Sequence, residues 1–282
     1  MLNNLIEEFI DLALREDIGD GDHTSLACIP YDARGTAQLL VKEEGIIAGI
    51  GIAEKIFLKL DRSCEFNQLI EEGTIIKPGD IIFRIKANIQ SILKAERLVL
   101  NIVQRMSGIA TQTSHYVKAL EGLSTKILDT RKTTPGMRLL DKEAVKIGGG
   151  INHRIGLYDM ILLKDNHIDF AGGIEAAILR TKNYLAEKKK SLKIEIEARS
   201  IKDVEIILKV GGVDRILLDN FSVSDTRKAV ELINGAFETE SSGNITLENI
   251  RSYAECGVDY ISSGALTHQI KSIDLSLKAI DF

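Results

Sequence analysis

Apolar and polar positions alternate regularly through the second half of the chain. From about residue 125 onward, short apolar segments are separated by longer stretches in which apolar residues recur every three to four positions. The first pattern is typical of buried strands and the second of amphipathic helices. The apolar segments are 126–129, 160–163, 192–197, 215–219, 236–240 and 259–263, and the helical stretches are 137–147, 173–187, 201–210, 224–234 and 246–256.

Strands that alternate with helices at this spacing predict βα units built on a parallel sheet. Two serines, Ser200 and Ser222, stand where helices are expected to begin, and both are good helix-capping residues. No GxGxxG sequence follows the first predicted strand. These features favour an incomplete or open (β/α) barrel of about six to seven strands over an open doubly wound sheet.

The first half of the chain has a different pattern. Amphipathic spacing predicts helices at 1–15, from Gln90 to about Met106, and from Ile109 to Leu120. Between the first two lie β-rich stretches punctuated by glycine, at 35–42, 46–50, 64–69 and 81–86. The overall prediction is an α/β protein with three parts: an N-terminal α+β, sandwich-like domain (1–110), the barrel (111–265), and a C-terminal segment that packs back on the first domain (about 266–282).

Composition excludes several classes of protein. The 282 residues are 44% hydrophobic and 27% charged, as in an ordinary globular protein, and the net charge of −5 does not suggest binding to nucleic acid. The three cysteines are far apart and form no CxxC pair, which excludes a disulfide framework and a cysteine zinc site. Apolar runs are too short to span a membrane, and acids occupy the N-terminus where a signal peptide would be basic. We therefore expect a cytoplasmic protein.

Polar side chains follow nearly every apolar segment. In a (β/α) barrel, the carboxyl ends of the strands surround the ligand site. Exposure explains a few such polar ends, but not acids such as Glu195 and Glu197, which alternate with isoleucines. The polar strand ends include the cations Arg131, Lys132 and Lys164, and together with Arg154 these predict a pocket for a polyanionic small molecule. The residues are Asp129, Arg131, Lys132, Lys164, Asp165, Glu195, Glu197, Asp219, Asn220, Glu240, Ser242, Ser262, Ser263 and Gly264.

Two of these strand ends contain glycine and lead towards a helical stretch. They are Ser241–Asn244 and Ser263–Leu266. Barrels commonly bind phosphate at this position through backbone N–H groups and a helix N-terminus. Ordinary turn formation explains either one alone equally well. Their occurrence in successive units favours phosphate binding.

In order along the chain, these residues resemble the quinolinate phosphoribosyltransferase family. The resemblance covers essentially the whole chain and includes two departures: Asn244, where many members have a second glycine, and Gln269, where serine is common. Its motifs are Glu16–Ser25, Glu96–Arg97, Ser107–Thr111, Asp129–Gly136, Gly148–Leu157, Lys164–His167, Glu195–Glu197, Leu217–Phe221, Glu240–Gly243 and Gly264–His268.

The resemblance implies a pentosyltransferase of NAD biosynthesis. Members transfer the phosphoribosyl group of 5-phosphoribosyl-1-pyrophosphate to quinolinate and release pyrophosphate and CO₂, which gives nicotinate mononucleotide. They use Mg²⁺, bound with the phosphoribosyl donor. The resemblance further implies at least a dimer, either a homodimer or a hexamer built as a trimer of dimers, in which Arg97 enters the site of the neighbouring subunit.

The resemblance also implies a role for each polar strand end. The cations that bind the carboxylates of quinolinate are Arg131, His153, Arg154 and Lys164. Lys132 lies beside the pyrophosphate, and Thr130 belongs to the same substrate-binding set. Glu197 and Asp219 contact the ribose hydroxyls and the magnesium, directly or through water. The residues around the 5′-phosphate are Ser242, Gly243, Asn244, Ser263, Gly264 and Ala265. The catalytic residues are Lys132, Lys164, Glu197 and Asp219.

Two other interpretations remain open on the sequence alone. One is a related enzyme of the same fold, either a paralogue associated with molybdenum utilisation or a transferase that acts on nicotinate. The other is a catalytically silent anion-binding or assembly protein. The cations favour a dicarboxylate substrate, and the acids Glu197 and Asp219 disfavour pure anion binding, since they would repel an anion.

Overall fold

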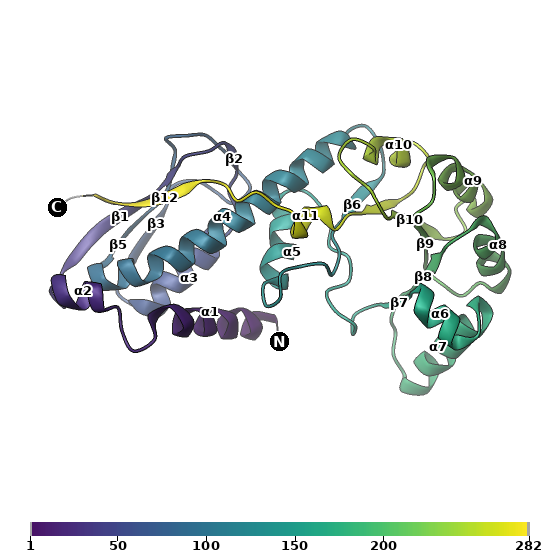
Figure 1. Ribbon diagram of the computed structural model, residues 1–282, viewed down its shortest axis with the longest axis horizontal. Helices are drawn as coiled ribbons and strands as arrows, with labels where there is room; N and C mark the ends of the chain where they lie inside the picture. The colour runs from purple at the N-terminus through teal and green to yellow at the C-terminus, as the bar shows by residue number, and fades with distance from the viewer. Residues whose placement is uncertain (1, 281–282) are drawn as a thin grey trace. The chain divides into compact units, whose positions relative to one another are not determined.

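The chain is described by a computed structural model that covers residues 2–280 (Figure 1). Contacts divide it into two compact units. Unit 1 comprises Met1–Ser114, Thr133–Gly149 and Thr267–Phe282, and unit 2 comprises His115–Lys132 and Gly150–Leu266. Within the described residues, no helix has the length and apolar character needed to cross a membrane.

Unit 1 is built around an antiparallel sheet with the strand order β12-β1-β5-β3. The C-terminal strand β12 pairs with β1 from Thr36↔Ile280 to Val41↔Leu275, so the end of the chain completes this sheet. The four strands are β1 (Arg34–Val41), β3 (Glu65–Gln68), β5 (Ile81–Asn88) and β12 (Leu275–Ile280). The shorter pair is β2 (Gly45–Ile46) and β4 (Ile75–Ile76), and the helices are α1 (Leu2–Ile18), α2 (His23–Cys28), α3 (Ile50–Leu60), α4 (Ile89–Ala119) and α5 (Arg138–Ile147).

Several helices of this region differ from the prediction, and the short α2 was not predicted at all. The stretches expected as separate helices form the single helix α4, and Gly108 lies inside it. A Cβ at Gly108 would lie 2.3 Å from the backbone oxygen of Lys271, so this glycine permits a close crossing of the chain and does not end the helix. The prediction also missed α3, whose first N–H groups, at Gly49 and Gly51, donate to the carboxylate of Glu72.

Unit 2 contains a parallel six-stranded sheet with the order β6-β11-β10-β9-β8-β7. This arrangement confirms the predicted α/β class and incomplete barrel, because β6 pairs with β11 whereas no described ladder joins β6 to β7. On the open side, Ile151 forms an isolated parallel bridge with Leu128 of β6. The strands are β6 (Lys126–Leu128), β7 (Ile161–Leu163), β8 (Ile194–Ala198), β9 (Arg215–Asp219), β10 (Glu238–Ser242) and β11 (Tyr260–Ser262).

The helices of unit 2 follow the strands, and Figure 1 shows α8 and α9 on the outer side of the curved sheet. The predicted helix starts at Ser200 and Ser222 are confirmed, because each serine side chain accepts a hydrogen bond from a backbone N–H three residues later. The helices are α6 (Asp165–Ala171), α7 (Ile174–Lys188), α8 (Ile201–Val210), α9 (Val223–Ile233), α10 (Ile250–Ala254) and α11 (Ala265–His268).

The predicted helix at 137–147 exists as α5, but its contacts place it in unit 1 and not among the barrel helices. Asp141 of α5 is fully buried and accepts a bidentate pair of hydrogen bonds from Arg105 of α4, both 2.9 Å long. A Cβ at Gly148 would lie 2.4 Å from the backbone oxygen of Ala110. The chain thus leaves the barrel after Lys132, packs on α4, and returns at Gly150.

Candidate active site

Four charged residues meet inside the barrel of unit 2, and we call them the buried charge cluster: His153, Glu195, Arg215 and Glu240. The Glu240 carboxylate is fully buried and lies 2.9 Å from Arg215 Nη1 and 3.5 Å from His153 Nε2. Glu195 Oε2 lies 2.9 Å from the same His153 nitrogen. The strand pairing accounts for the arrangement, because Glu195 stands opposite Arg215 in the ladder between β8 and β9.

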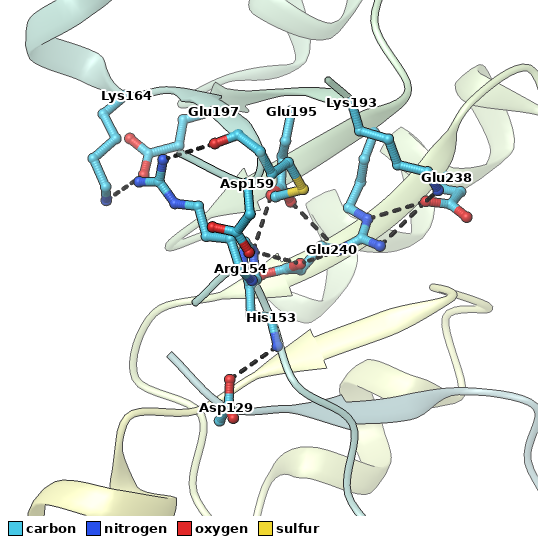
Figure 2. Close-up of polar contacts among 12 residues, drawn as sticks. Asp129, His153, Arg154, Asp159, Lys164, Lys193, Glu195, Glu197, Glu238 and Glu240 are labelled. Carbon is cyan, nitrogen blue, oxygen red and sulfur yellow. Dashed lines mark hydrogen bonds and ion pairs between the residues drawn. The ribbon is translucent and has the colours of Figure 1, made fainter. Parts of the chain in front are cut away.

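Figure 2 shows His153 between Asp129 and the two acids of the buried charge cluster. Asp129, which follows β6 and is fully buried, accepts a 2.9 Å hydrogen bond from the backbone N–H of His153. The chain that follows the glycine triplet (148–150) is therefore fixed at His153 in two ways, through the backbone N–H and through the imidazole ring. This anchoring determines where the next residue, Arg154, enters the site.

The protonation of His153 follows from its surroundings. Burial alone lowers the pKa of His153, but its contacts with Glu195 and Glu240 outweigh burial and raise the pKa to about 9. At Nδ1 the backbone N–H of Arg154 approaches to 2.7 Å. Because a protonated Nδ1 cannot accept a hydrogen bond, the doubly protonated ring requires this N–H to turn away. In either form Nε2, which faces the acids, carries a proton.

The pKa values of the two glutamates of the cluster shift in opposite directions, although burial raises both. Burial and the neighbouring charge of Glu240 raise the pKa of Glu195. For Glu240, burial is outweighed by the hydrogen bond and charge of His153, together with Arg215, so its pKa is lowered. The contact of Glu195 with His153, 2.9 Å from Oε2 to Nε2, lowers the pKa of Glu195 but does not offset burial.

His153, Glu195 and Glu240 also present three potential metal-ligand atoms within 4.8 Å of one another. A metal there would need an unprotonated Nε2, whereas the Arg154 N–H at Nδ1 directs the ring proton to Nε2. Arg215 already supplies positive charge to Glu240. We therefore interpret the group as an ion-pair cluster.

Arg131 and Arg154 form the cationic part of the site. Burial, and then repulsion by the positive charge of Arg131, lower the pKa of Arg154. Arg154 is 8% exposed and donates to the backbone oxygen of Met160 at 3.2 Å. The buried Nε of Arg131 has no hydrogen-bond partner among the described residues. Two guanidinium groups whose charges repel each other are suited to an anionic ligand that accepts from both.

Lys164 and Glu197 form a second part of the site, also visible in Figure 2. Lys164 Nζ lies 2.9 Å from Glu197 Oε1, and the backbone N–H of Asp165 donates to Glu197 Oε2 at 3.0 Å. His167 accepts from the backbone N–H of Lys164 at 3.0 Å, which gives it a structural role at the start of α6. Burial, and then the charge of Glu197, raise the pKa of Asp219, so these two acids are neighbours.

The predicted phosphate-binding residues lie at the carboxyl ends of β10 and β11. We call Ser242–Asn244 the Gly243 turn; Gly243 has φ 93° and Asn244 φ 52°, both in the left-handed region. Asn244 thus adopts a conformation typical of glycine, which asparagine tolerates well. At the neighbouring strand end, Ser263 is 5% exposed and its hydroxyl donates to the backbone oxygen of Ile245 at 3.2 Å, while Gly264 and Ala265 open α11.

The remaining predicted residues differ in position. Thr130 Oγ1 accepts a 3.0 Å hydrogen bond from the backbone N–H of Lys132, whose side chain is exposed. Arg97 is exposed on α4 in unit 1, whereas every other predicted site residue belongs to unit 2. The Arg97 guanidinium makes no hydrogen bond or ion pair within residues 2–280.

The sequence prediction missed two residues that organise the site. Arg215 is the first residue of β9, at the strand end opposite to the one expected to carry ligands. Asn220 was noted only as a polar strand end, yet it contacts both Asp219 and Asn244. A buried-looking Ile-Glu-Ile-Glu strand signals that a cation must lie nearby, but not which one.

Comparison with known families agrees with this geometry. Residues 22–107 match the N-terminal domain of quinolinate phosphoribosyl transferase, and residues 109–278 match its C-terminal domain. The chain belongs to the quinolinate phosphoribosyl transferase family. The two matches together span nearly the whole chain, as the motifs predicted.

Individual members of the quinolinate phosphoribosyl transferase family are similar over most of their length. A Nicotiana glauca protein named quinolinate phosphoribosyltransferase [decarboxylating] 2, mitochondrial, is 46% identical and covers 97% of this chain and 82% of its own. A Synechocystis protein named probable nicotinate-nucleotide pyrophosphorylase [carboxylating] is 39% identical, covering 98% and 93%. The solved nicotinate-nucleotide pyrophosphorylase of Francisella tularensis superposes with a TM-score of 0.91 at 39% identity, covering 99% and 97%.

Proposed function

We propose that this protein transfers the phosphoribosyl group of 5-phosphoribosyl-1-pyrophosphate to quinolinate, with release of pyrophosphate and CO₂, to give nicotinate mononucleotide. The observation that carries the proposal is the pair Arg131 and Arg154, whose positive charges repel each other and whose side chains are half-buried and buried respectively. Arg131 Nε is buried without a partner among the described residues. A planar dicarboxylate satisfies such a pair, because each guanidinium can donate two parallel hydrogen bonds to a carboxylate.

The other residues divide between the two substrates. Arg131, Arg154 and Lys164 bind the quinolinate carboxylates. His153, which is held by the buried charge cluster, anchors the backbone that carries Arg154. Lys132 and Thr130 lie beside the pyrophosphate. Glu197 and Asp219 face the ribose hydroxyls. The 5′-phosphate is bound at the ends of β10 and β11, by Ser242, Gly243, Asn244, Ser263, Gly264 and Ala265.

The reaction proceeds in two stages. The pyridine nitrogen of quinolinate forms a bond to ribose C1′ as the bond from C1′ to pyrophosphate breaks, and the leaving group takes the electron pair. Positive charge develops on the sugar, and the carboxylates of Glu197 and Asp219 stabilise it. Lys132, beside the leaving pyrophosphate, offsets its negative charge.

In the second stage the pyridinium nitrogen acts as an electron sink. The bond between C2 and its carboxylate breaks, CO₂ leaves, and the electron pair remains at C2 until a proton replaces the carboxyl group. Lys164, which is paired with Glu197 at 2.9 Å, stabilises this carbanion. The protein positions and desolvates the reactants, and no protein nucleophile is needed.

Magnesium is part of the proposal. The donor set fits Mg²⁺, which prefers carboxylate oxygens, and the mutual repulsion that raises the pKa of Asp219 beside Glu197 is relieved by a cation. Glu197 and Asp219 would hold the ion, directly or through water. When bound with the donor, magnesium neutralises the pyrophosphate and makes it a better leaving group.

The activity is tested with quinolinate, nicotinate and nicotinamide, each supplied with the phosphoribosyl donor and Mg²⁺. We expect a nucleotide product only from quinolinate, with one CO₂ released per nucleotide. Product from nicotinate without CO₂ would point to the related transferase. No product from any of the three would contradict the proposed enzyme and favour an anion-binding protein.

We also propose that the active form is at least a homodimer, in which Arg97 completes the site of the neighbouring subunit. An exposed guanidinium on α4, in the unit that carries none of the other site residues, supports this arrangement. The test mixes two inactive variants, Arg97→Ala and Lys164→Met. If Arg97 acts in the neighbouring subunit, each mixed dimer has one intact site, and an equimolar mixture, in which about half of the dimers are mixed, regains about a quarter of wild-type activity. Action within its own subunit restores none.

Location in the cytoplasm belongs to the same proposal. The three cysteines are unpaired, and Cys28 is exposed, which suits a reducing compartment. A Nicotiana glauca relative is named mitochondrial, so fractionation of the source cells, with activity followed in each fraction, is the deciding measurement.

A further inference from the structure

Two asparagines in the left-handed conformation stand at the ends of neighbouring strands. Asn220, directly after β9, has φ 55°, and Asn244, two residues after β10, has φ 52°. The two strands pair in parallel, with Asp219 opposite Ser242. Both asparagines are exposed, so burial does not explain their conformation.

Asn220 makes three hydrogen bonds at the two strand ends, and two of them join one end to the other. Its backbone N–H donates to the backbone oxygen of Ser242 at 2.8 Å. Its side-chain Oδ1 accepts from Asn244 Nδ2 at 3.2 Å, and its Nδ2 donates to Asp219 Oδ2 at 2.9 Å. One amide thus contacts both the acid that faces the ribose and the turn that binds the 5′-phosphate.

The Gly243 turn is packed directly against this amide. A Cβ at Gly243 would lie 2.2 Å from Asn220 Oδ1 and 2.6 Å from its Cγ. On its other side the turn is held by Asn249, whose Nδ2 donates to the backbone oxygen of Asn244 at 3.0 Å. The position of the turn relative to Asp219 is therefore set by the Asn220 side chain.

We propose that Asn220 is a positioning residue that fixes the spacing between the Asp219 carboxylate and the Gly243 turn, and so determines affinity for the phosphorylated sugar donor. The inference rests on the proposed function, in which these two groups bind the ribose and the 5′-phosphate of one molecule. A left-handed turn alone would be satisfied by glycine. The two side-chain bonds of Asn220 add the connection that glycine lacks.

The first test is Asn220→Gly, which keeps the backbone conformation and the bond to Ser242 but removes the amide. We expect the KM for the phosphoribosyl donor to rise about tenfold, as for the loss of one or two hydrogen bonds. The KM for quinolinate should stay within about twofold. The matched control is Asn234→Gly. Asn234 is exposed and has φ 45°, but it follows α9 and precedes β10, so it lies at the amino ends of the strands, away from the site. The control should leave both KM values unchanged.

A double-mutant cycle separates positioning from a general loss of structure. Asn244→Gly removes the same bond from its other end, so its effect on the donor KM should overlap with that of Asn220→Gly and not multiply with it. Asn220→Asp keeps an acceptor for Asn244 and should recover part of the donor affinity, although it loses the bond to Asp219. Independent, multiplicative effects of the two glycine variants would contradict the inference.

Ribose 5-phosphate binding, measured by calorimetry, makes the test independent of turnover. We expect the affinity to fall about tenfold in Asn220→Gly and not in Asn234→Gly. If the wild type makes no nucleotide from quinolinate, the proposed activity fails, and this binding measurement still decides the role of Asn220. Equal affinity in wild type and Asn220→Gly overturns the inference, whatever the melting temperatures.

Discussion

Replacing Glu240 by glutamine tests whether the buried charge cluster holds unit 2 together. The change keeps the shape of the side chain but removes a charge that is 2.9 Å from Arg215 and 3.5 Å from His153. At an effective dielectric constant of about 20, opposite charges 2.9 Å apart attract by about 6 kcal/mol. Glutamine also removes the repulsion from Glu195 and the cost of burying a carboxylate. The net loss of stability should therefore be about 3 kcal/mol.

Thermal unfolding measures this loss. At roughly 3 °C per kcal/mol for a protein unit of this size, Glu240→Gln should lower the melting temperature by about 10 °C. The matched control is Glu255→Gln, which removes the same group from the exposed Arg251–Glu255 pair at 3.1 Å. An exposed pair contributes at most about 1 kcal/mol, so the control should melt within about 3 °C of wild type. A Glu240→Gln protein that melts with the control would refute the idea that the buried pairing stabilises the barrel.

Three further predictions address the site directly. Lys164→Met should lower kcat at least about a hundredfold with little change in the donor KM, measured by CO₂ release, and near-normal turnover would remove its role in decarboxylation. The pKa of His153 is about 9 in the folded chain against 6.5 in the unfolded chain, so its stabilisation is full below about pH 6.5 and is lost as the pH rises through 9. The melting temperature of wild type should therefore fall more steeply over this range than that of His153→Gln, and equal slopes would contradict the role of His153. Gly243→Ala should raise the donor KM at least about tenfold because its Cβ would meet Asn220 at 2.2 Å, whereas Gly235→Ala, with φ 75° and open space around it, carries a similar backbone strain without that contact and should leave the KM unchanged.

Much of the barrel could be predicted because its signals are local. Strand–helix alternation and the serine caps at 200 and 222 depend on neighbouring residues, and the structure has strands and helices close to where those residues indicate. The start of α3 could not be found in this way. Its capping carboxylate, Glu72, comes from more than twenty residues later in the chain, and the apolar run from 46 to 53 fits a strand as well as a helix.

Where the prediction and the structure differ for α4 and α5, the deciding contacts are between residues far apart in the sequence. A helical pattern at 137–147 shows that a helix forms but not which unit receives its apolar face. The buried pair of Arg105 and Asp141 makes that choice. Gly108 looks like a helix end until the backbone at Lys271, which crosses it, is known. In both cases the deciding contact joins residues that no local pattern connects.

The buried acids raise the question of how an anion site tolerates them. Glu195 and Glu240 are matched by Arg215 and by His153, whose pKa is raised to about 9. The charge of His153 is therefore balanced by these two carboxylates. The ring contributes to substrate binding chiefly by anchoring the segment that carries Arg154. The neighbouring guanidinium, Arg131, has a buried Nε with no partner among the described residues. We infer that the net attraction for a dicarboxylate comes from Arg131, Arg154 and Lys164. The buried charge cluster holds Arg154 in position.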